Sequence, residues 1–174
     1  MKKLIILFAA IVLMVGVTSR VTAQAITDTK SNQARAEILT AIALTTVTPL
    51  EFGGIAIGTE ASTVMVDTAS ARTLPTGDAT LLTTNHVPTA AYYTLTGTAL
   101  TLYTITVPTS PVAITKVGGS ATMNVTAFTC TYPSLTHLLS SGGAGAFHVG
   151  ATLTVGATQL GGTYTGPFDV TVAY

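Results

Sequence analysis

Short stretches in which aliphatic or aromatic residues alternate with threonine recur along most of the chain. The clearest are residues 62–67, 92–96, 102–107, 123–128, 152–155 and 168–172. Because successive side chains of a strand point to opposite faces, this alternation predicts strands with one apolar face and one threonine face. Segments rich in turn-forming residues separate them, at residues 76–78, 96–98, 108–111, 118–120, 141–143 and 161–162. Many short strands without helical patterns between them predict an all-β fold, an immunoglobulin-like antiparallel β-sandwich.

The apolar pattern of this domain begins near Ala36, so a single β-sandwich domain is predicted over residues 36–174. Residues 36–44 have apolar residues on both faces, which is typical of a strand covered on two sides. A short helix over residues 34–43 is the competing prediction, because alanine, arginine, glutamate and leucine are good helix formers. Residues 24–35 lack sustained periodicity and are predicted to be a mobile N-terminal leader.

The first 25 residues have the pattern of a signal peptide. Lys2 and Lys3 precede an apolar run over residues 4–17, and small residues follow around Ala23 and Ala25. Fourteen apolar residues are too few to span a bilayer comfortably as a helix. We therefore expect a signal peptide over residues 1–23, with cleavage after Ala23 or after Ala25. The mature chain is expected to be exported through the periplasm to the cell surface or beyond, without stable membrane insertion.

The last predicted strand, Phe168 to Tyr174, carries only one charge, at Asp169. A long uncharged strand at a sheet edge presents unpaired backbone groups, so it invites pairing with another segment. Four alternating residues are predicted to form this acceptor edge: Phe168, Val170, Val172 and Tyr174. The predicted donor strand lies at residues 36–44 of the same or another copy, with Ile38, Leu39, Ile42 and Leu44 as its apolar residues. The β-sandwich would then lack one strand of its own.

Composition narrows the classes of partner. The chain has 174 residues, of which 48% are hydrophobic and only 8% are charged, and 36 are threonine. Without Lys2, Lys3 and Arg20 of the signal peptide, 7 − 3 = 4 basic residues face 7 acidic ones, a net charge of −3. No basic stripe remains, which argues against binding of nucleic acid or of an anionic membrane surface.

The sequence offers no pattern typical of catalysis, and we expect a non-enzymatic protein with no cofactor. His86, His137 and His148 lie far apart, and no spacing typical of metal ligands is present, so no metal site is predicted. A Gly-x-Ser-x-Gly nucleophile motif is also absent. Cys130 is the only cysteine, so it cannot form an internal disulfide and is expected to be a small buried apolar residue.

Two further features concern the surface. Thr68 lies in the sequence Asp67-Thr68-Ala69, which resembles an O-glycosylation signal of exported bacterial proteins, so Thr68 is a candidate modification site. The glycine-rich residues 140–147 are predicted to form a flexible loop that could serve as a contact surface.

An ordered series of motifs carries a family resemblance. It runs through Leu50-Glu51-Phe52-Gly53, Tyr93-Thr94-Leu95-Thr96-Gly97, Tyr103-Thr104-Ile105-Thr106-Val107-Pro108, Met123-Asn124-Val125-Thr126-Ala127-Phe128, Thr152-Leu153-Thr154-Val155-Gly156 and the last thirteen residues. From about Leu44 to Tyr174 the chain resembles the DUF4402 family of exported bacterial domains of unknown function, which has no assigned catalytic residues. Val149-Gly150-Ala151, where the family usually has a second glycine, and Pro167 in the last turn depart from the family pattern.

A looser similarity, of architecture only, is to the subunits of chaperone–usher-type pilins. These have an incomplete immunoglobulin-like sandwich that receives its missing strand from a neighbour. We therefore expect an exported structural subunit of a bacterial surface fibre, such as a fimbria, or of a matrix, with copies of itself or related subunits as partners. The alternative is a monomeric surface adhesin or binding module of the same fold, which would bind a surface glycan or a protein receptor.

Overall fold

The computed structural model describes residues 28–84, 86–132 and 137–174, and the predicted signal peptide lies outside these ranges. The chain divides into two units, Met1–Glu37 and Ile38–Tyr174. Residues 28–42 form neither helix nor strand, so the competing helix over residues 34–43 is not formed. None of the described residues belongs to a helix long and apolar enough to cross a membrane.

Every regular element of the described chain is a strand. They are β1 (Ala43–Thr48), β2 (Ile55–Ala56), β3 (Ser62–Val66), β4 (Arg72–Thr76), β5 (Thr80–Leu81), β6 (Ala91–Thr96), β7 (Leu102–Thr106), β8 (Val112–Lys116), β9 (Thr122–Cys130), β10 (His137–Leu138), β11 (Ala144–Val155), β12 (Tyr164–Thr165) and β13 (Thr171–Ala173). All of their pairings are antiparallel, which confirms the predicted all-β, antiparallel class.

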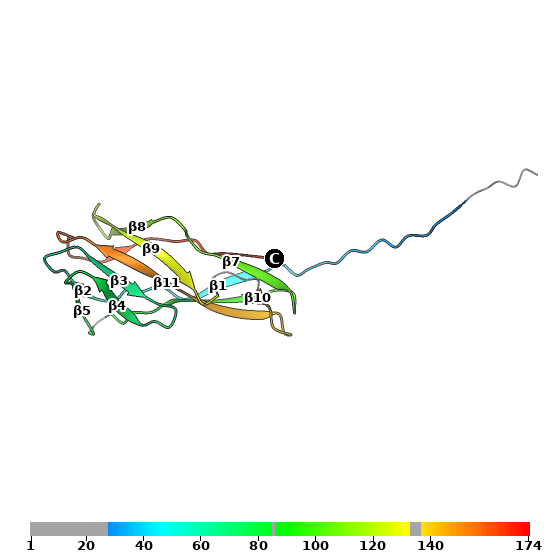
Figure 1. Ribbon diagram of the computed structural model, residues 1–174, viewed down its shortest axis with the longest axis horizontal. Helices are drawn as coiled ribbons and strands as arrows, with labels where there is room; N and C mark the ends of the chain where they lie inside the picture. The colour runs from blue at the N-terminus through cyan, green and yellow to red at the C-terminus, as the bar shows by residue number, and fades with distance from the viewer. Residues whose placement is uncertain (1–27, 85, 133–136) are drawn as a thin grey trace, which may run out of the picture. The chain divides into compact units, whose positions relative to one another are not determined.

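The long strand β11 organises the main sheet, whose order is β1-β6-β11-β9-β8-β12 (Figure 1). The first half of β11 pairs with β6, and its second half pairs with β3, which in turn pairs with β4. A smaller sheet has the order β10-β7-β13, and β2 pairs with β5. Because β11 pairs first with β6 and then with β3, the main sheet has two halves, one containing β6 and one containing β3. Different segments pack on the two halves.

The small sheet covers the half of the main sheet that contains β6. Buried side chains from both sheets form the first core cluster: Ala91, Tyr93, Leu95, Tyr103, Cys130, Leu139, Phe147 and Val149. Five buried residues of the other half form the second core cluster: Val64, Val125, Ala151, Leu153 and Val155. Threonines such as Thr63, Thr152 and Thr154 alternate with these residues and are less buried, as the alternation predicts.

Two sequence-based expectations need correction. The predicted loop at residues 140–147 is shorter, because Ala144–Phe147 belong to β11 and pair with β6. Gly145 lies in this strand and not in a turn. A glycine is suited to this position because a Cβ would come within 3.2 Å of the Leu95 side chain and of the Tyr103 hydroxyl.

The predicted last strand is also shorter, since only Thr171–Ala173 pair with a neighbour, β7. Residues 166–170 connect β12, which pairs with β8, to β13, so they pass from the main sheet to the small one. Pro167 lies in this crossing segment and has no backbone N–H to donate to a ladder.

Candidate functional site

The second half of the main sheet carries an apolar face that the small sheet does not cover. Seven side chains from β8, β9 and β11 line the floor of a cavity of about 860 Å³: Val112, Ile114, Met123, Val125, Phe128, Leu153 and Val155. Val125 of β9 is opposite both Val112 of β8 and Leu153 of β11, so the floor is continuous across three strands. We call this cavity the apolar groove.

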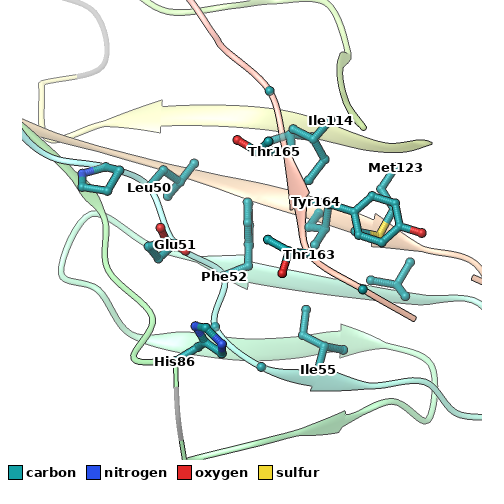
Figure 2. Close-up of a pocket in the computed structure, with 18 of the residues that line it drawn as sticks. Leu50, Glu51, Phe52, Ile55, His86, Ile114, Met123, Thr163, Tyr164 and Thr165 are labelled. Carbon is teal, nitrogen blue, oxygen red and sulfur yellow. The ribbon is translucent and has the colours of Figure 1, made fainter. Parts of the chain in front are cut away.

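Two extended segments flank the apolar groove. The first wall is residues 49–57 and the second wall is residues 159–168 (Figure 2). The first wall pairs through Glu51 with Thr89 and through β2 with β5. The second wall pairs through β12 with β8. Within the described ranges each wall is thus paired on one side only, and the apolar groove lies between them.

Arg72 of β4 holds the first wall in place. Its guanidinium donates hydrogen bonds to the carbonyl oxygens of Phe52, at 2.9 Å, and of Gly54, at 3.0 Å, and also to the carbonyl oxygen of Leu82. Gly53 between them has a φ of 76°, and a Cβ there would collide with the guanidinium. The rigid fork of donors therefore fixes the curved backbone of the wall.

Polar contacts also order the second wall. The Tyr164 hydroxyl donates to the carbonyl oxygen of Leu160, at 2.6 Å, and accepts a hydrogen bond from the Gln159 amide, at 2.7 Å. The same amide donates to the carbonyl oxygen of Thr122, at 3.2 Å. These contacts attach the wall to β9 at Thr122.

The lining of the apolar groove consists mostly of apolar residues and glycines. Glu51 is its one formally charged residue, it is exposed, and His86 lies near it on the same rim (Figure 2). No group of three histidine, cysteine or carboxylate side chains suited to a metal ion occurs among residues 28–84, 86–132 and 137–174. The apolar floor between two extended walls has the shape and polarity to hold an apolar, extended segment of polypeptide.

The loop after the first wall is fixed by the carboxylate of Asp78. It accepts hydrogen bonds from the backbone N–H and hydroxyl of Thr59, at 2.8 and 2.7 Å, and from the N–H of Glu60, at 3.0 Å. The backbone hydrogen bond from Thr59 is the largest cause that lowers the pKa of Asp78 below its ordinary value of 3.8. The charged form is therefore the one that stabilises this loop.

We expect Asp78→Asn to lower the melting temperature at neutral pH, because the charged acceptor is lost. A lowered pKa means that the contribution of Asp78 is present above its unfolded value and is lost as the pH falls through the folded value. The difference between the two proteins should therefore shrink below about pH 4. Thermal melts from pH 3 to 7 test this, and a difference that does not depend on pH would contradict it.

The predicted acceptor residues lie along the C-terminal segment. Phe168, Val170 and Val172 pack against the first core cluster, and the Phe168 ring lies 5.1 Å from the Phe128 ring. Strand β13 is at the edge of its sheet, with β7 as its one partner in the described chain. Tyr174 is 42% exposed, and its hydroxyl donates to the carbonyl oxygen of Thr40, at 2.8 Å.

The predicted donor residues fall into two groups. Ile42 and Leu44 pack against the first core cluster of their own domain, and Leu44 is opposite Leu95 of β6. Ile38 is 94% exposed and Leu39 is 39% exposed. The division comes at Thr40, whose carbonyl oxygen binds Tyr174 and whose N–H donates to the Thr98 hydroxyl at 2.6 Å.

The remaining candidate residues are dispersed. The His137 ring lies tilted against the Tyr132 ring with centres 4.0 Å apart, and His148 stacks on Tyr92 at 4.7 Å. Cys130 is buried, and burial raises the pKa of its thiol, which therefore stays protonated at neutral pH. Thr68 lies partly buried in the turn between β3 and β4.

Two comparisons found nothing, and one found a family. The model of the family described as "Domain of unknown function (DUF4402)" matches residues 42–174. This range begins just after Thr40 and includes both walls of the apolar groove. A search of curated proteins found no match, and neither did a search of solved structures.

Proposed function

The chain belongs to the DUF4402 family, a domain of unknown function, and from this premise we propose that it is an exported, non-enzymatic structural subunit of a bacterial surface fibre or matrix. The subunits assemble by β-strand complementation, in which an extended segment of one chain adds to the fold of another. Its partners are copies of itself or related subunits.

The observation that carries this proposal is the apolar groove between two walls that are each paired on one side. The floor is buried at Val125, Leu153 and Val155 and partly exposed at Ile114, Met123 and Phe128. Apolar grooves of this kind are typical binding sites, and unpaired strand edges are templates for an added strand. An added strand gains backbone hydrogen bonds from the walls and buries its apolar side chains on the floor. The site therefore fits a strand better than a compact polar substrate.

The sequence supports export and a structural role. The pattern of residues 1–23 is that of a signal peptide, and a net charge of −3 after its removal gives no attraction to nucleic acid. Among residues 28–84, 86–132 and 137–174 no three histidine, cysteine or carboxylate side chains come together as metal ligands would, and the groove lining has one formally charged residue, Glu51. These observations favour an assembly or binding role over catalysis.

One observation favours the alternative, a monomeric adhesin or binding module. Strand β1 pairs with β6 of its own domain from Ala43 onward, and Ile42 and Leu44 already pack in their own core. Because β1, Ile42 and Leu44 of the same chain complete the half of the sheet that contains β6, the domain can fold without a neighbouring copy. In that case the apolar groove would bind an apolar ligand or the segment of a receptor.

The oligomeric state of the purified chain tests the proposal. We expect multimers on size exclusion with light scattering and linear particles in negative-stain electron micrographs. Deleting residues 24–39 should leave monomers, because the core residues Ile42 and Leu44 are retained while the exposed segment before Thr40 is lost. Deleting residues 24–31 alone is the matched control and should leave the multimers intact. A full chain that stays monomeric at all concentrations would contradict the proposal and favour the alternative.

A further inference from the structure

Resting on the proposed subunit function, we propose that the apolar groove of one copy binds residues 32–39 of a second copy as an extended strand. We call these residues the donor segment. Its side chains at Ala34, Ala36 and Ile38 face the floor, and those at Arg35 and Glu37 face solvent.

The sequence of the donor segment matches the groove in pattern. With period-two alternation, one face carries Asn32, Ala34, Ala36 and Ile38, while the opposite face carries both of the segment's charges. The floor of the apolar groove has no charged residue. Only this one of the two orientations therefore keeps Arg35 and Glu37 in water, which avoids the large cost of burying an unpaired charge.

The donor segment is available for binding in its own copy. Residues 28–41 are exposed and belong to no strand. Ile38 is 94% exposed, which leaves a large aliphatic side chain in water that burial in an apolar groove would stabilise. It belongs to no helix or strand, so no existing element has to unfold before it pairs with the walls.

Chain length argues that the donor comes from another copy. Thr40 is fixed by Thr98 and Tyr174, and the chain then runs along β1 to Thr46, which lines the near end of the apolar groove. Six residues span about 20 Å. If the chain folded back on its own domain, residues 34–39 would be needed to cover the distance from Thr40 to the groove. Only residues before 34 could then enter the groove, so the donor segment itself could not bind there.

The position of the apolar groove also indicates how successive copies would be arranged. Strand β2, which belongs to the first wall, and its partner β5 lie at the end of the domain away from the C-terminus (Figure 1). Tyr174, at the C-terminus, holds the root of the donor segment. Donor root and groove thus lie at different ends of one domain, so each copy can give a strand at one end and receive one at the other. Such head-to-tail contacts do not close a dimer but continue as a chain.

The test uses two pairs of substitutions in the full chain. Ile38→Asp removes the apolar anchor of the donor segment, and Leu39→Asp, on its opposite face, is the matched control. Ile114→Asp places a charge on the floor, and Thr115→Asp on the outer face of β8 is its control. We expect Ile38→Asp and Ile114→Asp to lower the concentration-dependent multimer fraction at least about tenfold, and both controls to assemble like the unmodified chain.

Mixing the two defective proteins gives the decisive result. Ile38→Asp keeps an intact groove and Ile114→Asp keeps an intact donor segment, so together they should form a one-to-one heterodimer that cannot grow. A synthetic peptide of residues 28–41 should also block assembly of the unmodified chain, and the same peptide with Ile38→Asp should not. The peptide experiment needs no altered protein, so it stays decisive if Ile114→Asp does not fold.

The outcomes separate the two proposals. Multimers that persist in Ile38→Asp, or that the peptide does not block, would overturn the donor segment while the subunit function stands. An unmodified chain that is monomeric but binds the peptide in an Ile38-dependent manner would support the donor and groove and overturn the fibre. A mixture that gives no heterodimer from two folded proteins would overturn the groove as the acceptor.

Discussion

Replacing Phe147 by alanine is expected to lower the free energy of unfolding by about 3–5 kcal/mol, the usual cost of removing a fully buried phenylalanine. Phe147 is 1% exposed and lies on β11, the strand that pairs with β6, β3 and β9. Its ring stacks on Tyr93 at 5.2 Å in the middle of the first core cluster. The deletion would leave a cavity between the two sheets that strands paired on both sides cannot close.

Urea denaturation followed by circular dichroism measures this effect. Phe168→Ala is the matched control, because Phe168 packs at the border of the same cluster and is partly exposed. Its loss should cost clearly less than the loss of Phe147. A cost below about 1 kcal/mol for Phe147→Ala would show that this cluster does not hold the two sheets together.

Replacing Arg72 is expected to affect both stability and assembly. Its guanidinium satisfies three backbone carbonyl oxygens, those of Phe52, Gly54 and Leu82. Hydrogen bonds to charged groups contribute about 1.5–3 kcal/mol each, and the exposure of this side chain reduces that value. We expect Arg72→Ala to lower the free energy of unfolding by about 2–3 kcal/mol in total, and to reduce multimer formation because the first wall is no longer fixed.

The conservative change separates geometry from charge. Arg72→Lys should recover less than half of the lost stability, because an ammonium group cannot reach three carbonyl oxygens as a planar fork does. Arg35→Ala, in the exposed part of the chain, is the control for the loss of one positive charge and should leave stability unchanged. Full stability in Arg72→Lys would mean that the charge alone matters and that the fork geometry does not.

The alternation of threonine with aliphatic residues predicted the strands of the main sheet well. In β3 and the second half of β11 one face is buried and the other partly exposed, which is the condition under which period two becomes visible in a sequence. Residues 144–147 were missed because glycine and alanine suggest a loop. Here small side chains are required by the close approach of Leu95 and Tyr103.

The apolar groove could not be predicted from the sequence, because its parts come together only in three dimensions. The first wall has a short alternation at Leu50 and Phe52 that Gly53 and Gly54 then break, so no strand was predicted there. The second wall follows a turn and pairs over just two residues of β12. Sequence pointed instead to the edge of the last strand. A strand-accepting site was expected, but its place on the floor of β8, β9 and β11 depends on the fold.

The small contact between Thr40, Thr98 and Tyr174 has a mechanical consequence. The Tyr174 hydroxyl binds the chain at Thr40, three residues before β1 begins at Ala43, so a force along the chain beyond Thr40 is carried by β1. The hydrogen bonds between antiparallel strands run perpendicular to that axis, so the β1–β6 ladder from Ala43 to Thr48 resists as a group in shear and does not open one bond at a time. Tension directed along β1 would therefore load these hydrogen bonds together.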